Sequence, residues 1–140
     1  MILLDTNVIS ALMRRAIEPS VEAYLRRQPP ESLCTSTVCE EEIRFGILRL
    51  QAGRRRDELA RAFRAFLARS LAERIIPFDS ACAEACAVTR ARLADSGMMI
   101  ARPDIMIAAT ALAHGATMAT RNVADFRRCG ITVENPWDST

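Results

Sequence analysis

Acidic side chains at separated places in the chain could together hold a divalent cation. Asp5 ends the first apolar run, and Asp104 directly follows a proline that can open a helix. Asn122 and Asp125 come just after a later apolar run, and Glu42 lies within a segment that has helical spacing. All of these except Glu42 are expected at strand ends or helix starts, the edge where α/β proteins bind ligands. Glu42 could project from its helix toward the same edge.

The chemistry of such a cluster follows from charge repulsion. Two carboxylates about 5 Å apart repel each other by about 3 kcal/mol at an effective dielectric constant of about 20. Several carboxylates raise one another's pKa values unless a cation lies between them. Oxygen ligands without nearby histidine or cysteine favour Mg²⁺ or Mn²⁺ over zinc. Because such an ion retains water and can hold a phosphate, the cluster points to hydrolysis of phosphodiester bonds.

Each acid also has a purely structural interpretation. Asp104 could serve the helix dipole, which favours an acid in a first turn. Glu42 belongs to the run Glu40–Glu42, which could be a solvated helix face, and Asp5 could simply cap the first helix. Taken one at a time, none of these residues identifies a site. Their convergence on one sheet edge is what favours the metal-site interpretation.

The elements that must position these residues alternate along the chain. The apolar runs predict strands at about residues 2–5, 33–35, 75–78, 116–120 and 131–133. Helical spacing, with proline and glycine boundaries, predicts helices at about residues 6–13, 19–27, 36–51, 54–69, 79–95 and 103–114. Thr6 or Asn7 is expected to cap the first helix. Strands separated by helices favour an α/β fold with a parallel sheet covered by helices.

Length and composition favour one domain, residues 1–140. Half of the residues are hydrophobic, which is enough for a core without disulfides or metals. No apolar stretch reaches the length of about 18 residues that a membrane span needs, and the short first run is not a signal peptide. The five cysteines form no C-x-x-C pair. We therefore expect a reduced protein in the cytoplasm, with no membrane association.

The charge balance limits how the chain could bind nucleic acid. A net charge of +2 excludes a strongly basic nucleic-acid coat but not a local basic face. Arg54, Arg55 and Arg56 begin a helix that presents such a face. They could be a solvated helix surface, a track for an RNA backbone or a contact with a partner protein.

Four segments resemble a known family. They are Leu3–Ser10, Glu41–Gly46, Pro103–Ala111 and Ala119–Phe126, with Asn135–Trp137 as a fifth and shorter match. In this order and spacing the chain resembles the PIN-domain ribonucleases, particularly the VapC and FitB type toxins of bacterial toxin–antitoxin pairs. The resemblance covers nearly the whole chain.

The resemblance implies a three-layer α/β/α sandwich around a central, mainly parallel sheet. It implies an endoribonuclease toxin that depends on Mg²⁺, with Mn²⁺ as a substitute. Asp5, Glu42 and Asp104 match three acidic positions of the family and are the expected metal ligands. Where many members carry a fourth acid this chain has Asn122, so either Asn122 or Asp125 completes the catalytic site. The supporting residues expected from the same segments are Thr6 and Thr120.

The resemblance also implies partners and leaves alternatives. A VapB-like antitoxin is expected to restrain the toxin, and a homodimer is expected to form through apolar surface near the early helices. A second hypothesis is a degenerate PIN module that binds RNA or a protein without cleavage, although the retained acids count against it. A phosphoacceptor domain also gathers acids at a sheet edge, but it needs a lysine, and this chain has none.

Overall fold

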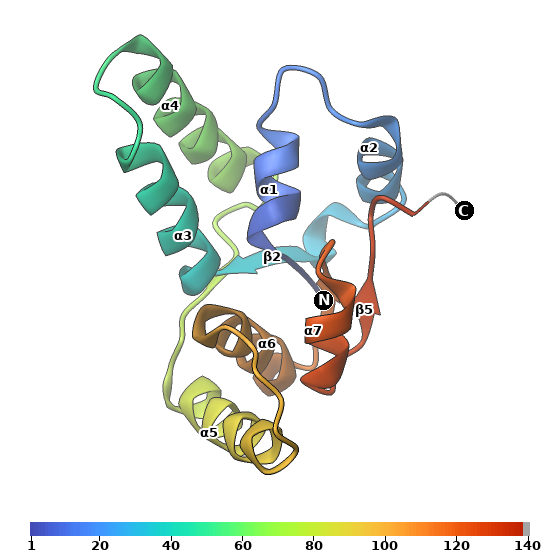
Figure 1. Ribbon diagram of the computed structural model, residues 1–140. Helices are drawn as coiled ribbons and strands as arrows, with labels where there is room; N and C mark the ends of the chain where they lie inside the picture. The colour runs from blue at the N-terminus through green and yellow to red at the C-terminus, as the bar shows by residue number, and fades with distance from the viewer. Residues whose placement is uncertain (139–140) are drawn as a thin grey trace.

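Parallel strands form the centre of the computed structural model, which describes residues 1–138 (Figure 1). Within these residues the strands are β1 (Ile2–Leu4), β2 (Leu33–Ser36), β3 (Ile75–Ile76), β4 (Thr117–Ala119) and β5 (Val133–Glu134). They pair in the order β3-β2-β1-β4-β5, and every pair is parallel. Ile2 aligns with Leu33 on one side and with Thr117 on the other. The first strand is therefore the middle of the sheet.

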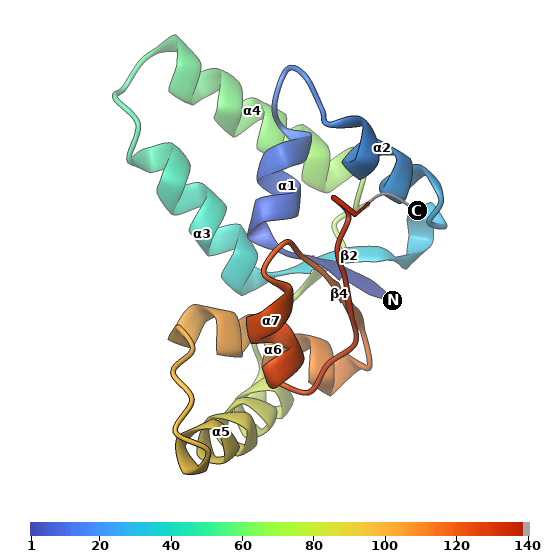
Figure 2. The same ribbon diagram turned by 45° about the vertical axis from the view of Figure 1, so that its right-hand side comes forward.

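Helices cover both faces of this sheet. One layer contains α1 (Thr6–Leu12), α2 (Pro19–Arg26), α3 (Thr37–Leu48) and α4 (Arg54–Arg69). The other contains α5 (Ser80–Asp95), α6 (Arg102–His114) and α7 (Val123–Arg128). Figures 1 and 2 show the two groups of helices on opposite sides of the strands. The three-layer α/β/α sandwich with a parallel sheet is confirmed.

Alternate strand residues supply two separate cores. Ile2 and Leu4 face the core shared with α1, α3 and α4, whereas Leu3 faces the core shared with α5 and α6. On β4, Met118 and Ala119 divide in the same way. All five side chains are buried. Burial on both faces explains why the strands appear in the sequence as continuous apolar runs.

Several expected boundaries were wrong in detail. The cap of α1 is Asp5, the structural alternative given for that residue, and not Thr6 or Asn7, because its carboxylate accepts the hydrogen bond of the Thr6 backbone N–H. The last strand is Val133–Glu134 instead of residues 131–133, since Met118 aligns with Val133. The helix α7 was not among the elements expected. The third helix ends at Leu48, three residues earlier than expected.

Two further expectations concern the cysteines and membrane-spanning helices. All five cysteines are buried and unpaired within the part of the chain that the structure describes. Over residues 1–138, no helix has the length and apolar character needed to cross a membrane.

Candidate active site

Asp5 lies at the carboxyl end of the central strand and is only 4% exposed. Its backbone N–H donates to the Ala119 carbonyl at 3.0 Å, continuing the pairing of β1 with β4. Its Oδ1 accepts from the Thr6 backbone N–H at 2.8 Å, and its Oδ2 accepts from the Thr120 hydroxyl at 2.6 Å. Burial raises the pKa of Asp5, whereas these two hydrogen bonds lower it and the charge of Glu42 raises it. Asp5 is therefore both the cap of α1 and a fixed, inward carboxylate.

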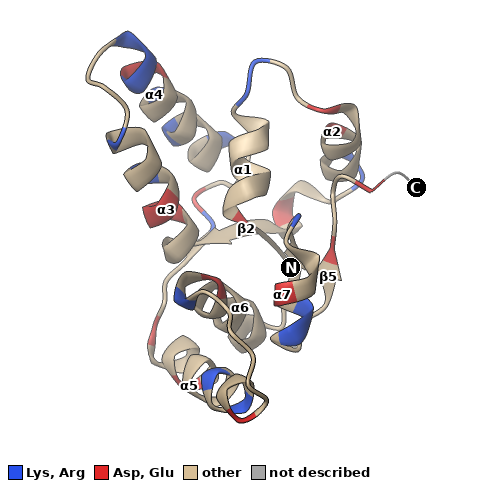
Figure 3. Ribbon diagram, viewed as in Figure 1, with Lys and Arg blue, Asp and Glu red and all other residues tan. Residues whose placement is uncertain are grey.

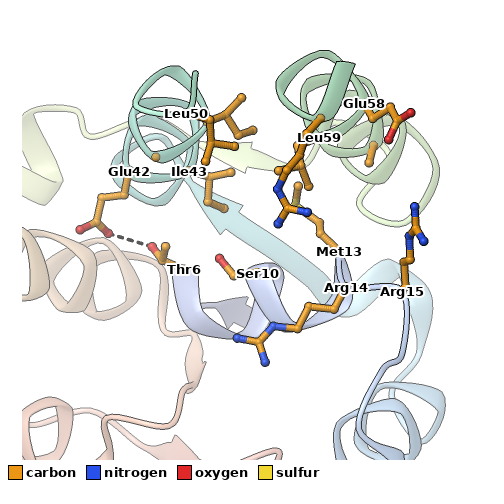
Figure 4. Close-up of a pocket in the computed structure, with 14 residues that line it drawn as sticks. Thr6, Ser10, Met13, Arg14, Arg15, Glu42, Ile43, Leu50, Glu58 and Leu59 are labelled. Carbon is orange, nitrogen blue, oxygen red and sulfur yellow. Dashed lines mark hydrogen bonds between the residues drawn. The ribbon is translucent and has the colours of Figure 1, made fainter. Parts of the chain in front are cut away.

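Glu42 comes to the same edge from α3. The Ser36 hydroxyl caps this helix by accepting from the Cys39 backbone N–H at 3.1 Å, and Ile43 packs into the core. Glu42 is half-buried, and its Oε1 accepts from the Thr6 hydroxyl at 2.8 Å (Figure 4). Thr6 thus holds Asp5 through its backbone and Glu42 through its side chain. Thr6 thereby links the two acids, whatever their role.

Asp104 stands in the first turn of α6, on the opposite layer of helices. Its carboxyl group is half-buried, and its pKa is raised to about 6. Burial is the largest cause, followed by the negative charges of Asp5, Glu42 and Asp125. Because these charges act on Asp104, the structure brings together acids from four separate parts of the chain. This is the electrostatic state that a bound cation would relieve.

Asn122 and Asp125 lie just beyond β4. The Asn122 side-chain amide donates to Asp125 Oδ2 at 3.3 Å, and Arg128 pairs with Asp125 Oδ1 at 3.4 Å. Asp125 occupies the first turn of α7. It contributes negative charge at Asp104, so both residues belong to the cluster.

The Thr120 hydroxyl makes three hydrogen bonds at the candidate site. It donates to Asp5 and accepts from the Asn122 backbone N–H at 3.0 Å and from the Asn7 side-chain amide at 3.4 Å. A hydroxyl has one proton and two acceptor lone pairs, so this arrangement directs the proton to Asp5. Asn7 also accepts from the Arg121 backbone N–H at 3.3 Å. Sequence reasoning overlooked Asn7 in this role, although its place two residues after Asp5 was a signal.

The donor set suits a hard cation. Carboxylate, hydroxyl and amide oxygens dominate the cluster, which fits Mg²⁺ or Mn²⁺. Within residues 1–138, however, no three acidic, histidine or cysteine side chains stand close enough to cage a metal. Mg²⁺ does not require such a cage, because it commonly binds one or two carboxylates and completes its shell with water and phosphate oxygens. Asp5 and Asp104 therefore remain suitable ligands.

A groove of about 530 Å³ opens beside the acids, between α1, α3 and α4 (Figure 4). Thr6 and Glu42 line its end at the site, and Ile43, Leu50 and Leu59 form part of an apolar wall. The residues that add charge to the lining are Arg14, Arg15, Arg55 and Glu58. Arg54, Arg55 and Arg56 begin α4 at the end of that helix farther from the sheet (Figure 3). The structure therefore separates these arginines from the acidic cluster, with only Arg55 on the groove.

The family model described as PIN domain matches residues 2–131. The chain belongs to the PIN domain family. This PIN domain is 38% identical to VapC ribonuclease Y4jK of Sinorhizobium fredii, over 99% of each chain. It is 36% identical to toxin FitB of Neisseria gonorrhoeae, over 98% of this chain and 99% of the relative. The crystal structure of FitAcB from Neisseria gonorrhoeae superposes with a TM-score of 0.91, covering 99% of this PIN domain and 100% of that chain at 36% identity.

Proposed function

We propose that this PIN domain is a metal-dependent endoribonuclease, the toxin of a type II toxin–antitoxin pair. The observation that carries the proposal is the convergence of Asp5, Glu42 and Asp104 at one edge of the sheet, with charge repulsion acting on Asp104. The family supports it, since a relative that aligns over the whole length is named a VapC ribonuclease. We place its action in the cytoplasm, where RNA substrates are made.

Each residue of the site would have a distinct role. Asp5 and Asp104 would hold Mg²⁺ or Mn²⁺, and Glu42 would orient a water molecule, since no three acids among residues 1–138 stand close enough to cage the ion. When bound, the cation would supply positive charge for a phosphate and acidify water for attack on phosphorus. Thr120 and the Thr6 backbone hold Asp5 as a hydrogen-bond acceptor, so its carboxylate stays oriented. Thr6 fixes Glu42 in the same way through its hydroxyl.

The test uses purified protein free of antitoxin. It should cleave RNA with Mg²⁺ or Mn²⁺, leave 5′-phosphate and 3′-hydroxyl ends, and stop when EDTA is in excess. Glu42→Gln should lose most cleavage, whereas Glu41→Gln, an exposed neighbour on the same helix, should retain it. Asp5→Asn should lose both cleavage and calorimetric Mg²⁺ binding while staying folded. Equal cleavage in EDTA, or a fully active Asp5→Asn protein, would refute the mechanism.

The proposed partner is a VapB-like antitoxin, which would use the groove beside Glu42. Its apolar wall suits an apolar segment of a partner, and its arginines suit acidic residues at the margin of that segment. Met13→Glu places a negative charge in the groove. The control, Met99→Glu, places the same charge away from the groove, at a residue that is 94% exposed. Only the first variant should weaken copurification of the antitoxin from the native operon. Equal antitoxin binding by both variants would exclude the groove.

A homodimer is also part of the proposal. Phe45 and Leu48 are 59% and 62% exposed and lie one turn apart on α3, so together they form a small apolar patch. We assign the dimer contact to this surface, which belongs to the early helices. Light scattering should show a dimer for the wild type and a monomer for Phe45→Glu. A monomeric wild type at micromolar concentration would contradict this assignment.

A further inference from the structure

Arg121 and Trp137 form a stacked pair just beyond the ends of β4 and β5. The Arg121 guanidinium lies over the Trp137 ring at 4.7 Å from its centroid. Arg121 is exposed, whereas Trp137 is half-buried and packs against the core beneath α1 and α4. Tryptophan is the aromatic residue that attracts a cation most strongly, and such contacts hold an exposed cation with up to about 1 kcal/mol. The pair therefore presents an oriented guanidinium to solvent.

The backbone on both sides places this pair at the carboxyl edge of the sheet. The Thr120 N–H donates to the Glu134 carbonyl at 3.0 Å, so the pairing of β4 with β5 reaches the residue before Arg121. The Arg121 N–H donates to the Asn7 side chain at 3.3 Å, which fixes it against the start of α1. Asn135 Oδ1 accepts from the Trp137 backbone N–H at 3.0 Å, which fixes a local turn in the tail. Hydrogen bonds therefore hold the backbone of both Arg121 and Trp137 in place.

The backbone of Arg121 is close to Asp5, one of the groups proposed to hold the metal. It directly follows Thr120, whose hydroxyl donates to Asp5, and consecutive Cα atoms are about 3.8 Å apart. Among residues 1–138, ion pairs engage Arg26, Arg44 and Arg128 but not Arg121. Its charge is thus available for a ligand. A guanidinium binds phosphate through two parallel hydrogen bonds from its N–H groups. Stacking on the ring covers one face of the guanidinium and leaves these N–H groups at its edge free.

We propose that Arg121, held on the face of Trp137, binds a backbone phosphate of the RNA that flanks the acidic cluster. This inference rests on the proposed ribonuclease function and adds a substrate-binding residue to it. The acids at Asp5 and Asp104 repel a polyanion, so a fixed cation at the adjacent strand end offsets part of that repulsion. Pre-orientation by the ring lowers the entropy lost when the phosphate binds.

The test measures RNA binding and turnover separately. A labelled single-stranded RNA oligonucleotide is titrated with Asp104→Asn protein, which should not cleave it, with and without Arg121→Gln. Affinity should fall about fivefold, and the salt dependence of log Kd should lose about 0.7 of its slope, the value for one phosphate contact to single-stranded RNA. In otherwise native protein, Arg121→Gln should raise KM and change kcat little.

Matched variants separate phosphate binding from a purely structural role. Arg121→Lys keeps the charge and should restore the salt slope, whereas Trp137→Leu should keep the slope and weaken affinity about twofold. Arg69→Gln removes an exposed arginine from the last turn of α4, where the chain leads into β3 at the opposite edge of the sheet. This control should bind RNA like the parent protein.

Distinct outcomes would overturn the inference. If the native protein cleaves RNA and Arg121→Gln binds with unchanged affinity and salt slope, Arg121 is no phosphate ligand and the ribonuclease function stands. If Arg121→Gln weakens only antitoxin binding, the residue belongs to a protein contact. If it lowers only thermal stability, the stacked pair simply anchors the tail. Absence of RNA cleavage by native protein would instead refute the proposed function.

Discussion

Replacing Asp104 with asparagine should stabilise the metal-free protein at neutral pH while removing its activity. The pKa of Asp104 rises from the ordinary 3.8 to about 6, because burial and neighbouring acids disfavour its charge. By linkage, that difference corresponds to about 3 kcal/mol in the free energy of unfolding. Solvent screening of a half-buried carboxyl group lowers the expected effect to about 1–2 kcal/mol.

The pH dependence gives this prediction its sign. A carboxyl group whose pKa is raised by folding binds its proton more tightly in the folded state, so ionisation destabilises the fold. The advantage of Asp104→Asn should be complete above a pH of about 6. It should shrink as the pH falls from about 6 toward about 4, and it should vanish below the ordinary pKa of 3.8. Asparagine and a protonated Asp104 carry the same charge there.

Urea unfolding in EDTA at about pH 7.5 and about pH 3.5 measures both limits. Added Mg²⁺ should stabilise the wild type but not Asp104→Asn, and so reduce the difference between them. Glu41→Gln, which neutralises an exposed carboxylate on α3, serves as the control and should show a small effect at either pH. A metal-free Asp104→Asn protein that is less stable than wild type at neutral pH would refute the argument that the acids repel one another.

Further predictions concern the hydrogen bonds around the cluster. Thr120→Val removes the hydroxyl that donates to Asp5, and cleavage rates should fall about 10- to 100-fold while the circular dichroism spectrum is unchanged. Asp125→Asn should reduce the cleavage rate by about the same factor without abolishing cleavage, and Asn122→Ala should have an effect of the same size. If both variants cleave at the wild-type rate across a Mg²⁺ titration, neither residue completes the site. Tyr24→Phe deletes a hydroxyl that donates to Glu134 at 2.6 Å, so urea unfolding should show a loss of about 1–2 kcal/mol with cleavage retained.

Much of the fold could be predicted because its signals are local. Apolar runs broken by proline and glycine located the strands and most helices, and buried parallel strands need no knowledge of their partners. The acids were predictable for a related reason. Asp5 and Asp104 follow a strand end and a helix start, and α/β sheets gather such positions at one edge whatever the strand order.

The remaining features depend on contacts between distant parts of the chain. Thr120 could be named as a supporting residue, but its bond to Asp5 joins positions 115 residues apart and follows from the pairing of β1 with β4. The stacking of Arg121 on Trp137 likewise depends on how the tail leaves β5. The cap of α1 was left between Thr6 or Asn7 and Asp5, and only the contact of the Asp5 carboxylate with the Thr6 N–H decides for Asp5.

The strand order also governs when the site can exist during synthesis. The central strand β1 precedes its neighbour β4 by more than a hundred residues, and the sheet cannot close around it until Thr117–Ala119 have left the ribosome. Domains generally fold as units during synthesis, and the ribosome adds about 5–20 residues per second. Asp5 gains the Thr120 hydroxyl only at that point. A nascent or truncated chain that ends before β4 therefore carries Asp5, Glu42 and Asp104 without an assembled site, so activity has to wait for the synthesis of β4.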